Sequence, residues 1–394
     1  MKGKCLRGCV AILAVLMSEP ARAAVPPLAE LGKIIFQDTT LSSPPGQGCI
    51  SCHSPSSAFA DPRPVSPGAV TGREGRRNAP SLMYAALIPP LKLEDTYDEN
   101  GELEYIVEGG MFLDGRAQNI LEQVRQPFFE ANEMNIEGPA DLAAKFRKSA
   151  YAETLKGLVG EDDWEDDAKL NEQAYKALVA FLREPMFRPF NAAIDDYWAG
   201  DKDALTPAQQ RGLTIFETSA SCSVCHLTGV GTWPKPLLSD FGYDNLGAPS
   251  QSTKDPGLGG ETGIKEELGQ FRVPSLRNVT LTAPYLHNGS IKTLREVLEF
   301  YNKRDLEPDR WGPTDFPETV NHEDMGDLKL SEEQIDDLLA LMEAFTDRNL
   351  LEMKPGQLFP EVPDGVPPTA EREAFFQDPP ARIDLTVPRR PAKD

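Results

Sequence analysis

The most regular pattern in the chain is a helical repeat of apolar residues, which occurs once in each half. In both places the apolar positions follow the spacing i, i+3, i+4, i+7, which predicts an amphipathic helix with one buried face. The positions are Tyr175, Leu178, Val179 and Leu182 in the first segment and Ile335, Leu338, Leu339 and Met342 in the second. Ser331 and Gln334 have the spacing of a capping box, which marks the start of the second helix.

A shorter apolar segment lies earlier in each half. Residues 28–36 predict one helix and residues 211–216 another, with Thr206 as its N-cap and Pro207 in its first turn. No sustained alternation of apolar and polar residues indicates a strand, and 35 prolines and 31 glycines favour irregular connections. We therefore predict an all-α fold with long loops.

Two Cys-x-x-Cys-His pentapeptides, at residues 49–53 and 222–226, follow these shorter helices. In a c-type cytochrome the two cysteines form thioethers with the haem, and the adjacent histidine binds the iron. A zinc site would need four ligands, but each motif has one histidine and no second cysteine pair nearby. We therefore predict two covalently bound haem c groups, attached through Cys49, Cys52, Cys222 and Cys225 and ligated by His53 and His226.

The two motifs lie 173 residues apart, counted from His53 to His226, which is far more than one small cytochrome domain needs. The repeated order of helix, haem motif, loops and helix indicates a duplicated unit. We predict two tandem c-type cytochrome domains, at residues 24–200 and 201–350.

The last segment, residues 351–394, is rich in proline, which disfavours helix and sheet. We predict an extended C-terminal tail that wraps the body of the protein; a tail that reaches a partner is the alternative. Wrapping is favoured because four apolar residues of the tail should be buried, namely Leu358, Phe359, Phe375 and Phe376.

Residues 1–23 have the features of a secretory signal peptide. Basic residues precede an apolar run at residues 9–17, and a small-x-small triplet predicts cleavage near Ala23. The run is too short to span a membrane, and no later segment approaches the required length. We predict a periplasmic protein without a membrane span. Its Cys5 and Cys9 leave with the signal, so no structural disulfide is expected in the mature chain.

The chain is strongly acidic. Loss of the signal removes four basic residues and one acidic residue, which changes the formal charge from −22 to −25. Such a charge repels nucleic acid and would steer a basic protein partner toward the surface, although solubility alone could also explain it.

The chain contains four histidines, at positions 53, 226, 287 and 322. Because none lies between His53 and His226, the first haem has no second histidine available from its own half. Unless a methionine or a residue of the other half reaches it, the sixth position of its iron is open and could accept peroxide. Two six-coordinate haems in a plain electron carrier remain the alternative.

Several further segments carry a resemblance that covers nearly the whole mature chain. The sequence resembles the bacterial dihaem cytochrome c peroxidase and MauG family. Besides both haem motifs, the matching segments are Leu31-Gly32-Lys33, Leu41-Ser42, Arg77-Asn78-Ala79-Pro80, Gly109-Gly110-Met111-Phe112-Leu113-Asp114-Gly115-Arg116-Ala117, Phe271-Arg272-Val273-Pro274-Ser275-Leu276-Arg277-Asn278, Pro284-Tyr285-Leu286-His287-Asn288-Gly289 and Phe300-Tyr301-Asn302-Lys303.

The resemblance implies different roles for the two haems. The haem on His53 resembles the high-spin, peroxide-binding centre, and the haem on His226 resembles the low-spin centre. Cytochrome c peroxidases place a methionine as the far ligand of the second haem, whereas Tyr301 occupies that position here, as in the MauG branch. Phenolate oxygen favours ferric and higher states, whereas a thioether favours ferrous iron. A tyrosine that merely packs in its helix is the alternative.

Further residues match functional positions of the family. Gln123 and Glu133 match the catalytic distal pair of the first haem, and Pro127 and Met134 match flanking positions. Peroxide must exchange protons as its O–O bond breaks, which requires a polar group in this pocket. The segment between Pro55 and Pro80 lacks the histidine that blocks the iron in peroxidases until they are reduced, so no reductive activation is expected.

The resemblance also implies a calcium site and an interhaem position. Asn78 and the carbonyl groups of Thr282 and Pro284 match a calcium site, which suits the oxygen preference of that ion. His287 should hydrogen-bond a haem propionate, and His322 should lie on the surface. Leu113 replaces the tryptophan that relatives place between the haems. Because leucine cannot be oxidised, charge sharing between the haems must be direct, slower or routed elsewhere.

These observations predict an exported dihaem oxidoreductase that reacts with hydrogen peroxide at the first haem and relays oxidising equivalents through the second. The expected substrate is a partner protein, as in MauG-like modification of tryptophan. One alternative is a peroxidase that removes peroxide with electrons from a small cytochrome or cupredoxin. The other is an electron carrier without enzymatic activity.

Overall fold

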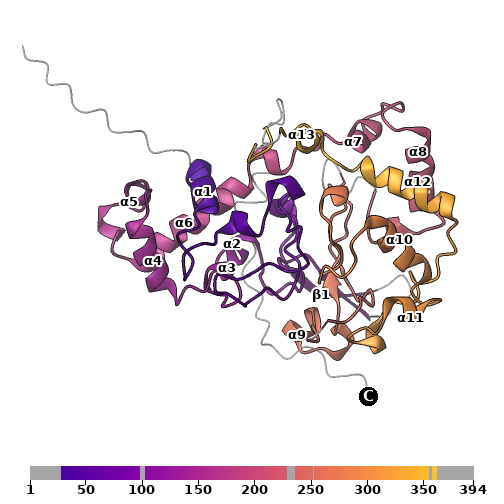
Figure 1. The fold of residues 1–394 in the computed structure, drawn as a ribbon, viewed down its shortest axis with the longest axis horizontal. Coiled ribbons are helices and arrows are strands. Elements are labelled where there is room, and N and C mark those ends of the chain that lie inside the picture. The colour runs from indigo at the N-terminus through magenta and orange to yellow at the C-terminus, as the bar shows by residue number, and fades with distance from the viewer. Residues whose placement is uncertain (1–27, 98–102, 229–235, 252, 355–356, 362–394) are drawn as a thin grey trace, which may run out of the picture.

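The computed structural model describes residues 28–97, 103–228, 236–251, 253–354 and 357–361. The predicted signal peptide and the tail residues Phe375 and Phe376 lie outside the described residues. The two halves of the chain lie side by side, with the first half in indigo and magenta and the second in orange and yellow (Figure 1).

The predicted amphipathic helices are present, and in each half the late helix packs on the early one. In the first half α1 (Leu28–Gln37) packs on α6 (Asp167–Leu182), and in the second half α8 (Pro207–Glu217) packs on α12 (Glu332–Glu343). The capping box at the start of α12 also forms, since the Ser331 hydroxyl accepts from the backbone N–H of Gln334.

Both helix pairs depend on a glycine at the crossing. A Cβ atom on Gly32 of α1 would overlap the carbonyl oxygen of Ala177 in α6, and one on Gly212 of α8 would overlap that of Asp337 in α12. Only glycine allows two helix backbones to approach so closely. The same glycine contact in both helix pairs agrees with the duplication inferred from the sequence.

The remaining helices are short and joined by long loops, as the proline and glycine content indicates. They are α2 (Ile120–Gln123), α3 (Gln126–Phe129), α4 (Pro139–Lys148), α5 (Ala152–Val159), α7 (Ala193–Trp198), α9 (Leu258–Thr262), α10 (Leu294–Lys303), α11 (Pro308–Trp311) and α13 (Arg348–Leu351). Among the described residues, no helix has both the length and the apolar character that a membrane crossing requires.

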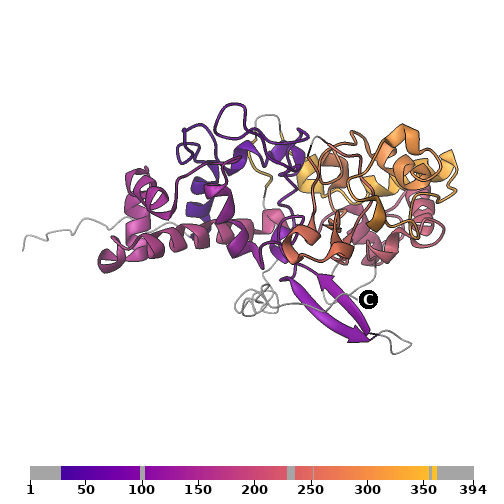
Figure 2. The same ribbon diagram turned by 90° about the horizontal axis from the view of Figure 1, so that it is seen from below.

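The prediction of a purely helical fold was wrong in one respect. Strands β1 (Lys92–Tyr97) and β2 (Leu103–Glu108) pair antiparallel as a hairpin that extends from the body of the protein (Figure 2). Strands β3 (Tyr243–Asp244) and β4 (Phe271–Arg272) form a second, two-residue pairing. Charged residues interrupt the alternation in the hairpin, and two residues are too few for any periodicity to be visible.

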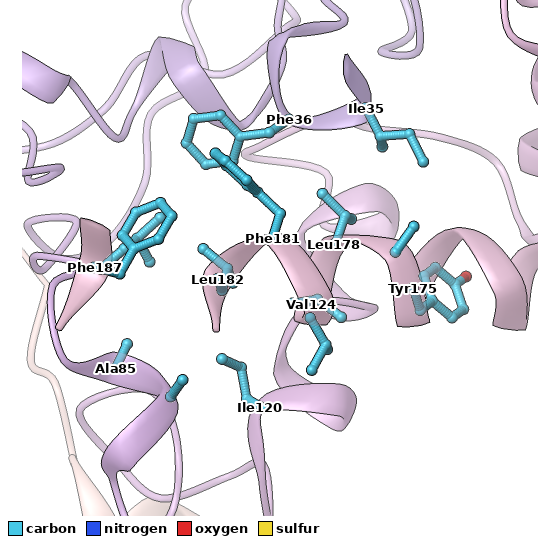
Figure 3. Close-up of a cluster of buried hydrophobic side chains, with 14 of the residues drawn as sticks. Ile35, Phe36, Ala85, Ile120, Val124, Tyr175, Leu178, Phe181, Leu182 and Phe187 are labelled. Atoms are coloured by element: carbon cyan, nitrogen blue, oxygen red, sulfur yellow. The ribbon is translucent and has the colours of Figure 1, made fainter. Parts of the chain in front are cut away.

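Apolar side chains form two main clusters. Most of the first lies between Leu31 and Phe190, where α1 and α6 face each other across Phe36 and Phe181 (Figure 3), and it also includes Leu237, Phe241 and Leu350. The second extends from Ala192 to Phe345. The domain limits proposed from the sequence stay a prediction, and three residues from beyond the expected boundary belong to the first cluster.

The described part of the tail agrees only partly with the expected wrapping. The ring of Phe359 packs against those of Phe36, Phe59 and Phe181, with centroids 6.4, 6.0 and 5.7 Å away. The burial predicted for Leu358 was wrong, because 55% of this residue is exposed. Leu358 and Phe359 lie in a bend that places the ring of Phe359 against Phe59 and leaves Leu358 facing solvent.

Candidate haem sites

Both haem motifs begin as a short 3-10 turn, at Cys49–Ser51 and Cys222–Val224. In each motif the backbone N–H of the histidine donates to the carbonyl of the first cysteine, over 3.0 Å in the first motif and 2.9 Å in the second. All four motif cysteines are free thiols rather than disulfides. The turns therefore keep both thiols and the histidine of each motif close together, as thioether attachment requires.

The two motif histidines have the same orientation. Nδ1 of His53 lies 2.9 Å from the carbonyl oxygen of Phe59, and Nδ1 of His226 lies 2.9 Å from that of Leu238. A carbonyl can only accept, so Nδ1 carries the proton and Nε2 keeps its lone pair for iron. Burial lowers the pKa of His53 and lowers the pKa of His226 to about 4, which keeps both imidazoles neutral.

A cavity of about 280 Å³ lies beside the second motif. It is lined by Cys222, Cys225 and His226, and Tyr301 of α10 lines it as well. Burial raises the pKa of the Tyr301 phenol, and the two cysteines are near enough to raise it further. The structure thus brings the two predicted axial residues of the second haem into one cavity, while the ligand role of Tyr301 stays a prediction.

Sequence reasoning missed three thioethers in this cavity. It is also lined by Met83, in the first half of the chain, by Met325, in the loop before α12, and by Met342, in α12. The loop that holds Met325 is tied to α10, because the backbone N–H of Gly326 donates to the carbonyl of Tyr301 over 2.7 Å. The sequence around Met325 did not indicate its place in the cavity, because the residue lies in a loop and not in a helix or strand with a regular repeat.

The residues proposed for the peroxide pocket come from α2, α3 and the loop after them. Gln123 ends α2, and the backbone N–H of Met134 donates to the carbonyl of Pro127 over 3.2 Å. Glu133 lies close enough to Cys49 and Cys52 to influence the pKa of both thiols. Burial raises the pKa of Glu133 itself, against the opposing effect of Arg116. The placement beside the first motif suits the proposed roles, which stay predictions.

The three residues proposed for calcium also line the cavity of the second motif. Asn78 is buried, and its Nδ2 donates to the carbonyls of Asp61 and Arg63 over 3.0 and 2.7 Å. Its side-chain oxygen, together with the carbonyls of Thr282 and Pro284, is the donor type that calcium prefers. In the described part of the chain no cluster of three or more His, Cys, Asp or Glu residues could hold a metal ion. The calcium site stays a prediction.

The other two histidines differ in environment. His287 lines the same cavity and stacks on Phe271, with ring centroids 3.7 Å apart. Its contact with a propionate stays a prediction. His322 lies on the surface as expected, with 60% of its side chain exposed and Nδ1 2.8 Å from an Asp305 oxygen. Leu113 lines the cavity too, and its carbonyl accepts from the backbone N–H of Arg272 over 2.8 Å.

Comparison with known proteins agrees with this geometry. The profile of the di-haem cytochrome c peroxidase family matches residues 26–203, and that of RoxA-like cytochrome c-like proteins matches residues 271–311. The chain is 34% identical to the methylamine utilization protein MauG of Paracoccus denitrificans (strain Pd 1222), over 86% of this chain and 95% of that protein. It is 28% identical to cytochrome-c peroxidase IdrP1 of Pseudomonas sp. (strain SCT), over 80% of each chain.

Solved structures give the same result. The diheme peroxidase BthA from Burkholderia thailandensis E264 superposes with a TM-score of 0.74 and 29% identity, over 86% of this chain and 91% of that chain. The protein therefore belongs to the dihaem cytochrome c peroxidase and MauG family. It is a haem-dependent oxidoreductase of the peroxidase type with two haem c groups, as the motifs indicate.

Proposed function

We propose that the protein is a periplasmic, MauG-like enzyme that uses hydrogen peroxide to oxidise a partner protein. In this proposal peroxide reacts at the His53 haem, and the His226 haem stores or relays the oxidising equivalents. The observation that carries the proposal is the presence of Tyr301 in the same cavity as His226. An oxygen ligand at this position stabilises oxidised iron, which a relay of strongly oxidising equivalents needs.

Each proposed residue then has a defined task. A haem c held by Cys49, Cys52 and His53 would supply an iron that reacts with peroxide. The Phe59 carbonyl holds the imidazole of His53 in one tautomer. Glu133 takes a proton from the incoming peroxide and returns it to the leaving oxygen, and Gln123 orients the peroxide by hydrogen bonding. The raised pKa of Glu133 suits a group that must both accept and donate a proton.

The diferric holoenzyme is expected to react with peroxide without prior reduction. The loop after the first motif contains no histidine between Pro55 and Pro80 that could bind the iron. Stopped-flow absorption after mixing with one equivalent of peroxide measures this reaction directly. A spectral change that requires previous reduction of the second haem would contradict the proposal and favour the peroxidase alternative.

The peroxidase alternative has its own support at the surface. Leu227, which directly follows His226, is 45% exposed. An exposed apolar residue next to a haem motif suits transient docking of a small cytochrome or cupredoxin. Sustained turnover of peroxide with such a donor would establish this function, whereas a plain electron carrier would not consume peroxide at all.

Replacing Tyr301 with methionine is expected to raise the reduction potential of the second haem while leaving it low-spin. Axial ligands tune haem potentials over about 0.8 V, and the change from phenolate to thioether should account for roughly 0.1 V or more. Spectroelectrochemical titration measures the shift. Tyr301→Phe is the matched control, because it removes the ligand atom and retains the ring. An unchanged potential and low-spin spectrum in both variants would assign the ligand to another residue, such as Met325.

A further inference from the structure

Tyr84 is a buried phenol with a buried carboxylate as its hydrogen-bond partner. Only 3% of Tyr84 is exposed, and its hydroxyl lies 2.9 Å from both Oδ1 and Oδ2 of Asp347. The phenolic oxygen also accepts from the backbone N–H of Phe190 over 3.0 Å. Tyr84 and Asp347 are 263 positions apart in the sequence, so only the fold brings them together.

The hydrogen bonds around Asp347 identify it as the proton acceptor. Nδ2 of Asn278 and the backbone N–H of Asn191 donate to its oxygens over 2.8 and 3.2 Å, in addition to Tyr84. An ionised carboxylate can accept from all of these donors, whereas a protonated carboxyl group would itself have to donate. Burial raises the pKa of Asp347, and the charge of Arg277 and the hydrogen bonds from Asn278 and Tyr84 oppose that rise. Burial raises the pKa of the Tyr84 phenol well above its usual value, so the proton rests on Tyr84.

Tyr84 lies on a path between the two haem sites. The carbonyl of Phe59 accepts from Nδ1 of His53 over 2.9 Å and from the backbone N–H of Leu82 over 3.3 Å. Two residues further along, Tyr84 lines the cavity that His226 lines. A hydrogen-bonded and covalent route thus connects the ligand of the first haem to a side chain that borders the second.

We propose that Tyr84 is the oxidisable relay between the haems, with Asp347 as its proton acceptor. The inference rests on the peroxide reaction proposed above. Peroxide is the two-electron oxidant, and it is reduced to water at the first haem. Tyr84 then gives one electron to the oxidised site while its phenolic proton passes to Asp347. The products are a neutral tyrosyl radical and a neutral carboxyl group, and both revert when an electron returns from the substrate side.

The charge near the ring explains why electron and proton must leave together. The guanidinium carbon of Arg277 lies 5.1 Å from the Tyr84 ring centroid and 4.6 Å from that of Phe190. This fixed positive charge opposes a radical cation on the ring, but it does not oppose a neutral radical. The relay would replace the route that Leu113 cannot provide, because an aliphatic side chain has no accessible oxidised state.

Freeze-quench electron paramagnetic resonance of the holoenzyme mixed with peroxide tests this relay. We expect a tyrosyl signal that narrows when the protein carries ring-deuterated tyrosine and falls at least about tenfold in Tyr84→Phe. Asp347→Asn should slow its formation by about tenfold or more, since it removes the proton acceptor. On the wild-type radical, electron–nuclear double resonance should detect exchangeable protons, because Asp347 and the Phe190 N–H both donate to the oxygen.

Tyr151→Phe is the matched control, because Tyr151 also donates to an aspartate, Asp38, over 2.7 Å but does not line the cavity of the second motif. The inference is contradicted if the signal survives in Tyr84→Phe or disappears in Tyr151→Phe. Peroxide consumption, measured on the same samples, distinguishes a failure of the proposed relay from a failure of the proposed function. Consumption without a tyrosyl radical contradicts the relay alone, whereas no consumption by wild-type enzyme contradicts the proposed function and the relay with it.

Discussion

Glu133→Gln should slow the reaction of the diferric enzyme with peroxide by about 10²- to 10⁴-fold, the usual range for loss of a positioned acid–base group. Glutamine keeps the shape and the hydrogen-bonding capacity of the side chain, but it cannot take up or release the proton. Because Glu133 lies beside Cys49 and Cys52, the change affects the proposed peroxide pocket directly. The second-order rate constant from stopped-flow absorption is the quantity to measure.

Glu130→Gln is the control for this result. Glu130 lies three positions earlier and is exposed, and its charge acts on Glu133 only through space. We expect this variant to react at close to the wild-type rate. A Glu133→Gln enzyme that reacts as fast as wild type would exclude Glu133 as the acid–base group and would leave Gln123 as the polar residue to test.

The second large effect concerns stability. Asp195→Asn is expected to lower the free energy of unfolding of the holoprotein by about 3–5 kcal/mol, because it leaves the charge of Arg277 buried without its partner. Both side chains are fully buried, and the guanidinium forms two hydrogen bonds to the carboxylate, over 3.0 and 2.9 Å. Urea unfolding followed by far-ultraviolet circular dichroism gives the difference.

Asp196, which follows Asp195 in the sequence, provides the control for this loss of stability. Asp196 pairs with Arg348 at the surface, where 40% of its side chain is exposed. Asp196→Asn should therefore change the free energy of unfolding by no more than about 1 kcal/mol, as is usual for exposed ion pairs. If both variants lost the same free energy of unfolding, the buried Arg277–Asp195 pair would matter no more to stability than an exposed ion pair.

Features that depend on local sequence could be predicted without a structure. The two haem motifs are contiguous pentapeptides, and the amphipathic helices follow a spacing that α6 and α12 retain. The β1–β2 hairpin was missed, although Asn100 and Gly101 between its strands are a typical turn pair. These two residues lie outside the described residues. Charged residues in both strands interrupt the period of two, so only the pairing of β1 with β2 shows this element.

Features that depend on distant parts of the chain were not predictable. The pairing of Tyr84 with Asp347 and the burial of Arg277 against Asp195 join segments that share no local pattern. Glu133 is one of 62 acidic residues, and only the family resemblance distinguished it from the others. Its position beside the first haem motif is a property of the fold.

The central claim is that the first haem has an open iron site while Tyr301 and His226 ligate the second. Electron paramagnetic resonance of the resting diferric enzyme tests this claim most directly, because high-spin and low-spin ferric haems give separate signals. The account predicts one high-spin haem and one low-spin haem, with the low-spin signal altered in Tyr301→Met. Two low-spin haems in the resting enzyme would contradict it, since neither iron could then bind peroxide.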